Sequence, residues 1–206
     1  LFAPTRSALE NLERENVLGA RYLTGDVHVD VLMRWLPKAL HSRIVEDLGL
    51  DKESYVVATI HRAENVDDKD KLYSIVQGLL GLTKHVKVVF PVHPRTRNRI
   101  KRYGFKKLLD DLIVIKPIGY FEFLGLLAKS LLVITDSGGV QEEALTLKVP
   151  CITVRYNTER PETVDAGINF LVGADEERII STANYVIENN DYIRRRVKVN
   201  PLGDGK

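Results

Sequence analysis

The sequence is poor in cysteine, in long apolar runs and in net charge. Its 206 residues include a single cysteine, Cys151, so no disulfide can form within the chain. No apolar stretch approaches the roughly 20 residues of a membrane-spanning helix. The formal net charge of +2 does not favour nucleic acid or a membrane surface as a partner. These absences predict a soluble globular protein of a reducing cytoplasm that binds neither nucleic acid nor membrane.

Several motifs of common nucleotide-binding and catalytic sites are also missing. There is no Gly-x-x-x-x-Gly-Lys-Ser/Thr phosphate loop, no Gly-x-Gly-x-x-Gly fingerprint and no Gly-x-Ser-x-Gly nucleophile elbow. Cysteine and histidine do not recur at the spacing of metal ligands. We therefore expect no metal and no cofactor, and the missing glycine motifs argue against an ATPase or a dehydrogenase.

What the sequence does contain is an alternation of apolar, β-branched runs with amphipathic helical patterns. The predicted strands are Tyr55–Ile60, Val86–Val92, Leu112–Ile115, Leu131–Thr135, Cys151–Val154 and Asn169–Val172. The predicted helices are Asp68–Lys84, Arg95–Tyr103, Tyr120–Lys129, Gly139–Leu147 and Glu176–Asn189. This order is typical of βαβ units, so we predict an α/β, Rossmann-like parallel sheet with helices on both faces.

Three further segments carry simpler predictions. Thr5–Asn16 reads as a charged helix, and Val27–Leu48 as a long helix that Pro37 should kink or break. The basic cluster Arg194–Lys198 is expected to be a solvated surface near the end of the domain. Cys151, within an apolar run, is expected to be a buried strand residue.

The most informative segment is Thr135–Ala144, which passes from a strand through Ser-Gly-Gly into a helix. Glycine lets a ligand approach the backbone, and the first N–H groups of a helix lack intrahelical partners, so such a turn suits a phosphate. Glu142 and Glu143 offer carboxylates to paired hydroxyls such as those of a ribose. In the plainer interpretation, Asp136 and Ser137 cap the helix and the glutamates only complement its dipole.

Polar clusters follow three other predicted strands, at His61–Asn65, His93–Arg95 and Arg155–Glu162. A lone histidine at a strand end is more often structural than functional. However, the carboxyl ends of parallel strands share one edge of a sheet, where ligands bind in open α/β folds. Arginine suits phosphate and histidine can donate near neutral pH, so the pattern favours a nucleotide-sugar site.

Five ordered motifs then carry a resemblance that covers essentially the whole chain. They are His61–Asn65, Pro91–Pro94, Thr135–Glu143, Thr158–Glu162 and Asn200–Lys206. Together they resemble the non-hydrolysing UDP-N-acetylglucosamine 2-epimerases. This family has the two-domain architecture of GT-B glycosyltransferases, so the resemblance implies the C-terminal, UDP-binding half of such an enzyme.

The resemblance also implies a division of the chain. Residues 1–24 would be the segment that leads out of an N-terminal domain, which the sequence does not contain. Residues 25–206 would form the UDP-binding domain, and the family's final helix would lie beyond the sequence. An apolar face near Leu1, Phe2 and the C-terminus is then expected to be exposed. The full-length protein would be a homodimer.

The family's functional residues map onto matching positions of this chain. Ser137, Gly138 and Gly139 would hold the diphosphate, Glu143 would take the ribose hydroxyls, and Phe123 would lie against the uracil, although a core aromatic is the alternative. His61 and Arg160 would face the phosphates as catalytic residues.

Other positions concern regulation and departures from the family. In some members, equivalents of Arg62 and His93 contact a second, regulatory UDP-GlcNAc molecule. The family usually has Asp where Tyr156 stands, which leaves open how the following loop is braced. His28 stands where a small residue is usual.

The implied reaction interconverts UDP-GlcNAc and UDP-ManNAc by elimination and re-addition of UDP, a step in cell-surface polysaccharide synthesis. The acid and base carboxylates of the family lie in the first domain, so this chain alone is expected to bind UDP without catalysis. Two alternatives stay open: a glycosyltransferase of GT-B architecture and a non-catalytic UDP-binding domain.

Overall fold

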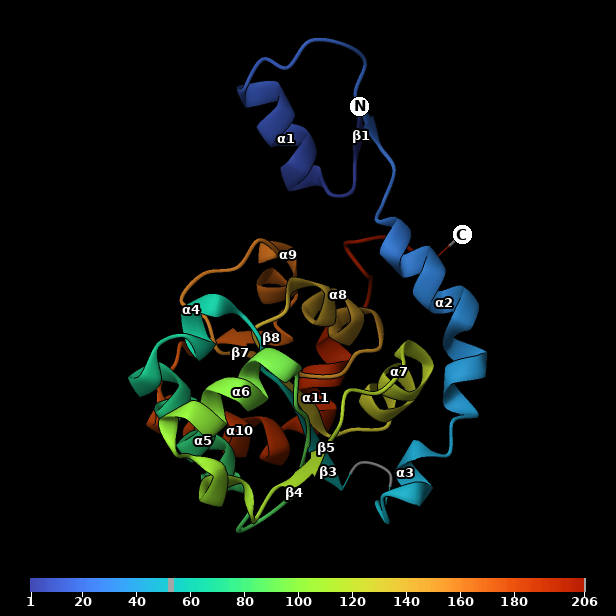
Figure 1. The fold of residues 1–206 in the computed structure, drawn as a ribbon. Coiled ribbons are helices and arrows are strands. Elements are labelled where there is room, and N and C mark those ends of the chain that lie inside the picture. Colours follow the sequence, from blue (N-terminus) through green and yellow to red (C-terminus); the bar gives the residue numbers. More distant parts are fainter. Residues whose placement is uncertain (52–53, 206) are drawn as a thin grey trace.

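A six-stranded parallel sheet forms the centre of the computed structural model, which describes residues 1–51 and 54–205 (Figure 1). Lys206, the last residue of the predicted C-terminal motif, lies outside the described residues. The strand order is β5-β4-β3-β6-β7-β8. The strands are β3 (Tyr55–Thr59), β4 (Lys87–Pro91), β5 (Ile113–Ile115), β6 (Leu132–Thr135), β7 (Cys151–Thr153) and β8 (Asn169–Leu171). Each lies within its predicted range, so the predicted Rossmann-like sheet is confirmed.

Helices cover both faces of the sheet, as predicted. Alternate strand residues point to opposite faces. Val56 and Phe90 pack with α5 and α10 on one face, whereas Val57 and Cys151 pack with α3 and α7 on the other. The helices of this main body are α2 (Val27–Leu40), α3 (Ile44–Asp47), α4 (Ala63–Val66), α5 (Lys69–Leu82), α6 (Pro94–Tyr103), α7 (Tyr120–Ala128), α8 (Gly138–Thr146), α9 (Pro161–Asp165), α10 (Glu176–Glu188) and α11 (Asn190–Arg196), with a 3₁₀ turn, η1 (Lys106–Leu109). Cys151 is fully buried, as expected.

The strand order reverses between β3 and β6. The chain runs outward from β3 through β4 to β5, then returns to β6 beside β3 and continues outward through β7 to β8. Thr59 of β3 is in register with Thr135 of β6. The loops after these two strands therefore leave side by side, and a crevice at such a reversal is the usual ligand site of open α/β sheets.

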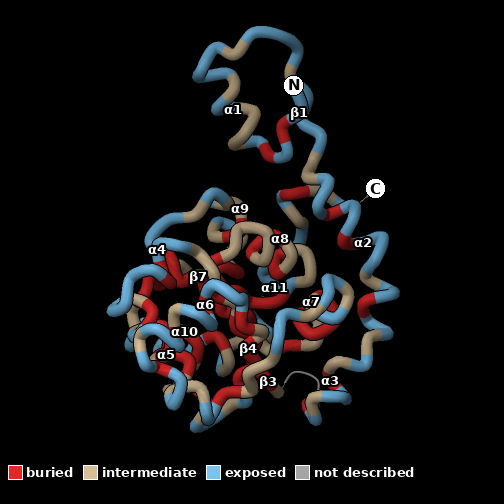
Figure 2. Tube along the Cα trace, in the orientation of Figure 1, coloured by how far each residue is buried: buried red, intermediate tan, exposed pale blue. Residues whose placement is uncertain are grey.

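Residues 2–23 form a small unit that projects from the main body (Figure 1). β1 (Phe2–Ala3) pairs in parallel with β2 (Tyr22–Leu23), and α1 (Arg6–Arg14) joins them. Thr5 caps α1 by accepting a hydrogen bond from the Ala8 N–H at 3.1 Å. No residue of α1 is buried, and Figure 2 shows the buried residues concentrated in the main body. The predicted charged helix is thus confirmed.

The helix break expected at Pro37 lies further along the chain. α2 does not end at Pro37 but continues to Leu40, and α3 begins at Ile44. Proline removes one backbone donor, but a helix with a buried face can tolerate that loss. Here Leu32 and Ala39 are buried against Leu124 of α7 on both sides of the proline, which holds the helix together.

Two expectations about exposure hold only in part. Leu1 and Phe2 are 49% and 77% exposed, as predicted, but Leu202 near the C-terminus is fully buried. Its carbonyl accepts a hydrogen bond from the Asp26 N–H at 2.7 Å, which ties the C-terminal segment to the start of α2.

In the basic cluster, Arg194 is not simply solvated, because its guanidinium donates to the Ser130 carbonyl at 2.7 Å and anchors α11 beside β6.

Candidate functional site

The buried carboxylate of Asp136 organises the two loops at the strand reversal. It accepts hydrogen bonds from the backbone N–H groups of His61 and Arg62, the latter at 2.9 Å, and from the Asn65 amide at 3.2 Å. His61 Nδ1 also lies 3.0 Å from its Oδ1. Burial alone would raise the pKa of Asp136, but these donors, led by the His61 side chain, lower it. The carboxylate therefore fixes the loop after β3.

This role corrects the plainer interpretation of the turn. Ser137 is the N-cap of α8, with its hydroxyl 3.5 Å from the Val140 nitrogen, as that interpretation expected. Asp136 does not share this role, because its side chain is directed to the opposite loop. Sequence reasoning missed these contacts because the partners are 71 to 75 residues away.

The two glycines of the turn are not required by the fold. Neither has a positive φ, and a Cβ added to Gly138 or Gly139 would meet no atom closer than 3.8 Å. Glycine at both positions therefore leaves the start of α8 without side chains, so an anion can approach its backbone N–H groups closely. This is the arrangement that a diphosphate needs.

Glu143 and Phe123 lie beside the turn on neighbouring helices. The pKa of Glu143 is raised to about 7, mainly by burial and also by the charge of Glu142, while His28 and Tyr120 oppose the rise. Phe123, on α7, lines a cavity of about 220 Å³ together with Thr59, His61, His93, Pro91, Pro117 and Ile118. A planar ring could enter this cavity at the ends of β3 and β4.

His61, His93 and Arg62 lie at the same edge but have different protein partners. The rings of His61 and His93 are 5.7 Å apart. His93 Nδ1 accepts from the Arg95 N–H at 3.2 Å, so this residue caps α6. Arg62 Nη1 lies 3.4 Å from Glu159 Oε1. His61 is 39% exposed, which leaves it accessible from the cavity.

Glu142 is not available to a ribose, contrary to the expectation for both glutamates. Its side chain is only 2% exposed and forms an ion pair with Arg160. Its other oxygen, Oε2, lies 2.9 Å from His28 Nδ1. The two adjacent glutamates thus differ: Glu142 is a buried anchor for cationic side chains, whereas Glu143 remains the candidate for the ribose.

The loop that carries Arg160 is braced by Arg155 rather than by Tyr156. Arg155 donates to Glu64 at 2.8 Å and to Glu159 at 2.6 Å, and the Arg155 hydrogen bond lowers the pKa of Glu159 to about 2. Tyr156 is 71% exposed and covers Gly173, where a Cβ would lie 2.4 Å from its ring. The ion pairs of Arg155 therefore brace this loop, although Tyr156 stands where the family usually has Asp.

A buried polar network joins this loop to α8. The Thr158 hydroxyl donates to Gln141 Oε1 at 2.6 Å and accepts from the Arg160 N–H at 3.0 Å. Asn169 Nδ2 donates to the same Gln141 oxygen at 3.1 Å. The helix that begins at the glycine turn therefore also positions the backbone of Arg160.

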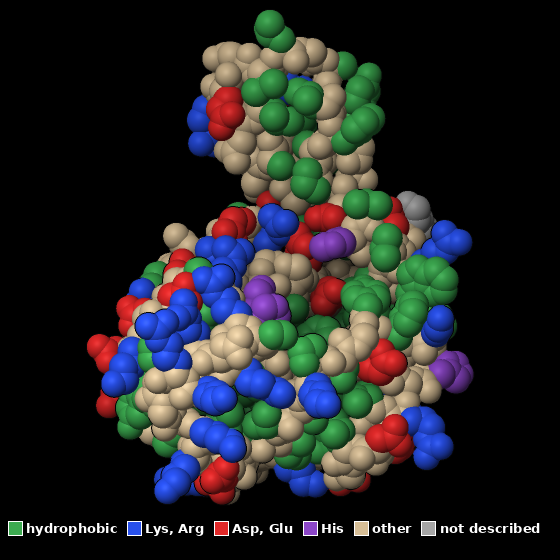
Figure 3. Space-filling model, viewed as in Figure 1, with side chains coloured by type: hydrophobic (Ala, Val, Ile, Leu, Met, Phe, Trp, Pro, Cys, Tyr) green, Lys and Arg blue, Asp and Glu red, His purple; other side chains and the backbone are tan. Residues whose placement is uncertain are grey.

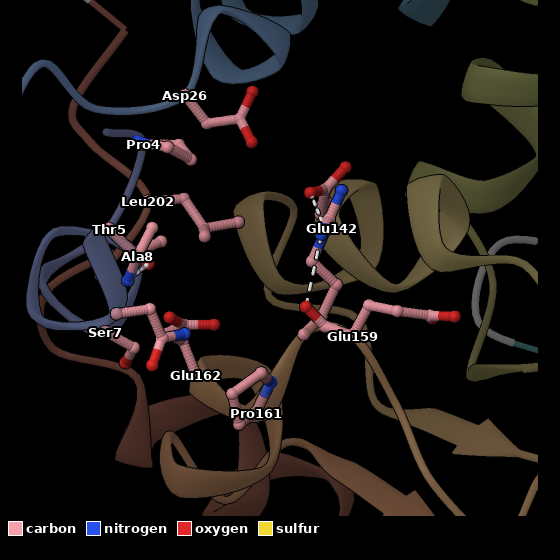
Figure 4. A pocket seen from close by; sticks show the side chains of 12 residues that line it. Pro4, Thr5, Ser7, Ala8, Asp26, Glu142, Glu159, Pro161, Glu162 and Leu202 are labelled. Carbon is pink, nitrogen blue, oxygen red and sulfur yellow. Dashed lines mark hydrogen bonds and ion pairs between the residues drawn. The ribbon is translucent and has the colours of Figure 1, made fainter. Parts of the chain in front are cut away.

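A second cavity, of about 130 Å³, lies where the β1–α1–β2 unit approaches α8 and α9. Figure 4 shows Thr5, Ser7 and Ala8 on one side of it and Glu142 and Glu159 on the other. In Figure 3, histidine and acidic side chains gather around the hollow beneath the projecting unit. Arg160 lines this cavity too.

Membrane-spanning helices and clusters of metal-ligand side chains are both absent from the described residues. Across residues 1–51 and 54–205, no helix has the length and apolar character needed to cross a membrane. Within the same residues, no group of three or more His, Cys, Asp or Glu side chains could hold a metal ion.

A parallel sheet with a bare glycine turn and converging arginine and histidine side chains at its strand reversal is typical of a nucleotide-binding domain. The sequence profile of the UDP-N-acetylglucosamine 2-epimerase family matches residues 1–206. The chain therefore belongs to the UDP-N-acetylglucosamine 2-epimerase family, which confirms the resemblance read from the motifs.

Individual relatives agree with this family. The UDP-N-acetylglucosamine 2-epimerase of Methanocaldococcus jannaschii is 40% identical over all of this chain and 57% of the relative. A crystal structure of that enzyme with UDP-GlcNAc and UDP has a TM-score of 0.89 over the same shares of the two chains. The UDP-2,3-diacetamido-2,3-dideoxy-D-glucuronate 2-epimerase of Pseudomonas aeruginosa is 43% identical over 89% of this chain and 51% of the relative. The chain thus spans about half the length of these relatives.

Proposed function

We propose that this chain is the nucleotide-binding half of a UDP-N-acetylglucosamine 2-epimerase and holds UDP at the strand reversal. The observation that carries the proposal is the bare turn at Ser137–Gly139, whose glycines serve no need of the fold. The diphosphate would lie on the N-terminus of α8, the ribose beside Glu143 and the uracil in the cavity that Phe123 lines. The M. jannaschii complex with UDP-GlcNAc and UDP supports this choice of ligand.

In this proposal, residues 25–206 are the UDP-binding domain and residues 1–24 lead to another domain of the whole enzyme. The separation of the β1–α1–β2 unit from the main body supports that boundary. The whole enzyme would be a cytoplasmic homodimer that supplies UDP-ManNAc for cell-surface polysaccharides. Arg62 and His93 would serve a second, regulatory UDP-GlcNAc.

The reaction would divide between the two halves. A base in the other half removes the C2 proton while the C1–O bond breaks. The electron pair of that bond leaves with UDP, and the sugar becomes a glycal. A proton then returns to the opposite face of C2 and UDP adds back to C1. His61 and Arg160 would stabilise the negative charge that grows on the departing diphosphate, and one well-placed donor can contribute about 10²- to 10³-fold in rate.

The P. aeruginosa relative supports a second candidate substrate. That protein is a 2-epimerase of a UDP-linked diacetamido uronate, and its identity to this chain is 43%. The nucleotide contacts proposed here would serve either substrate, because they involve only UDP. Competition between the two UDP-sugars for the full-length enzyme separates these candidates.

Calorimetry with UDP tests the nucleotide site. We expect the chain to bind UDP and Glu143→Ala to weaken binding by about 1–3 kcal/mol, because the ribose hydroxyls lose their acceptor. Glu177→Ala is the matched control, since Glu177 is exposed in the first turn of α10. Absence of UDP binding by folded protein would contradict the proposal.

Hydrogen exchange at the substrate tests the division of labour. We expect this chain to bind UDP-GlcNAc without exchanging its C2 hydrogen in D₂O, and the full-length enzyme to exchange it. A base must lie within roughly 3 Å of that proton, and the loops described here are committed to the nucleotide. Deuterium uptake at C2 catalysed by this chain alone, followed by NMR, would place the base within these residues.

A further inference from the structure

His28 stands beside the glycine turn although its own helix, α2, is remote in sequence. It lies in the first turn of α2, where its N–H donates to the capping carboxylate of Asp26 at 2.8 Å. A Cβ added at Gly139 would lie 3.8 Å from His28 Cε1, so the imidazole flanks the bare backbone of the turn. Its partner Glu142 is 114 residues away in sequence.

The buried carboxylate of Glu142 fixes the orientation of this ring. Glu142 pairs through one oxygen with Arg160, and its other oxygen lies 2.9 Å from His28 Nδ1. A carboxylate can only accept, so Nδ1 carries the proton of this contact. The second nitrogen, Nε2, has no protein partner in residues 1–51 and 54–205. Because the side chain is 61% exposed, Nε2 is accessible to a ligand.

The charges around His28 favour its protonated form. The hydrogen bond to Glu142 raises the pKa of His28, with smaller contributions from Asp26 and Glu143, while burial opposes the rise. Two guanidinium groups lie nearby: that of Arg160, which shares Glu142 with His28, and that of Arg62, whose Nη2 would lie 4.0 Å from a Cβ added at Gly138. The carboxylates that favour the charged imidazole are those of Asp26 at the cap of α2 and of Glu142 and Glu143 on α8.

We propose that His28 is a diphosphate ligand, whose protonated ring donates Nε2–H to a phosphate oxygen of a nucleoside diphosphate bound at Ser137–Gly139. This rests on the nucleotide site of the proposed function. Glu142 would then hold two cations, His28 and Arg160, at the turn. A charge-assisted bond of this kind is among the stronger hydrogen bonds in proteins. The contribution of His28 to diphosphate binding should grow as pH falls and the ring gains its proton.

The substitution His28→Asn separates the ligand role from the structural one. The asparagine amide can replace Nδ1–H as donor to Glu142, but it has no second nitrogen and no charge. His41→Asn is the matched control, because His41 lies just past the other end of α2 and its Nδ1 contacts the Pro37 carbonyl. UDP-GlcNAc is the probe, because its diphosphate is a diester and lacks the ionisation near pH 6 of a terminal phosphate.

Calorimetric titrations at pH 5.5 and pH 8 give the result. We expect His28→Asn to weaken UDP-GlcNAc binding about 10-fold at pH 5.5 and little at pH 8, the size of one hydrogen bond to a charged group. The ratio of the affinity of the unmodified chain to that of His28→Asn should thus rise as pH falls, whereas the ratio to His41→Asn should stay constant. Uridine, which lacks phosphate, should bind all three proteins equally.

Three results would overturn the inference in different ways. Binding with the same affinity and pH dependence in His28→Asn would make His28 only a partner of Glu142, with the proposed function intact. Failure of the folded, unmodified chain to bind UDP-GlcNAc would remove the nucleotide site and the His28 role together. An independent measurement is the NMR titration of His28, whose pKa should rise when UDP-GlcNAc is bound; an unchanged pKa would also overturn the proposal.

Discussion

At the scale of single residues, the buried carboxyl of Glu143 makes protein stability depend on pH. Burial raises its pKa from 4.5 to about 7 in the folded protein. The folded state therefore binds more protons than the unfolded state between these values, so the free energy of unfolding falls as pH rises from about 4.5 to about 7. The ionised carboxylate of Glu143 thus destabilises the folded protein at neutral and alkaline pH.

We expect Glu143→Gln to stabilise the protein at pH 8 by about 1–3 kcal/mol, because the charged form no longer has to be buried. At pH 5 the gain should nearly vanish, since the folded protein already carries a neutral carboxyl there. Thermal melts at both pH values measure this difference. Glu177→Gln, on an exposed helix turn, should show no such dependence; an equal gain for Glu143→Gln at both pH values would contradict the shift.

Residue types at the site could be predicted from the sequence, but the pairing of residues could not. Ser137, Gly138 and Glu143 stand out because their order and spacing are local. The contacts of Asp136 with His61 and of Glu142 with His28 span 75 and 114 residues. No periodicity in the sequence encodes such pairs. Glu142 and Glu143 therefore looked equally suited to a ribose in the sequence, although the structure gives them different partners.

At the scale of elements, α2 and α7 approach each other at a glycine. A Cβ added to Gly125 of α7 would lie 2.4 Å from the Ala39 carbonyl oxygen of α2. The Ala39 carbonyl is a backbone group and cannot rotate away from a new methyl group as a side chain can. Gly125→Ala therefore has to push α2 and α7 apart.

We expect Gly125→Ala to destabilise the protein by about 1–3 kcal/mol, the usual cost of overpacking. Gly119→Ala is the matched control at the N-cap of the same helix, because its Cβ would meet only the flexible carboxylate of Glu122. Denaturant unfolding of the two variants gives the comparison. Equal stability of both would mean that α2 moves freely on α7.

Element length explains which parts of the fold the sequence predicted. The long amphipathic α5 and α10 and the β-branched strands have clear periods, so the prediction found them. α4 has only four residues and α9 only five, and β1 and β2 have two each. Such segments are too short for a period and depend on tertiary contacts such as the pairing of Phe2 with Tyr22.

At the scale of the whole molecule, stability should be distributed unevenly. β3 and β6 lie in the middle of the sheet, and Val57 and Val133 are fully buried. By contrast, the β1–α1–β2 unit has a sheet of only two short strands and a helix with no buried residue. A two-stranded sheet is marginal without a covering layer.

We expect amide hydrogens of α1 to exchange orders of magnitude faster than those of β3 and β6, because local opening needs little free energy where few apolar groups are buried. Hydrogen exchange followed by mass spectrometry resolves the two regions. Comparable protection in α1 and β3 would show that the unit is held far more firmly than its contacts indicate.

The docking of α2 also gives the chain an intrinsic optical reporter. Its single tryptophan, Trp35, lies on α2 with its ring 5.6 Å from that of Phe121 on α7 and with the Lys38 ammonium 5.6 Å from its centroid. The fluorophore is therefore outside the sheet, on the contact between α2, which carries His28, and α7, which carries Phe123. The fluorescence emission of Trp35 should therefore change when the packing of α2 on α7 changes, even if the sheet remains intact. No attached dye is needed for this measurement.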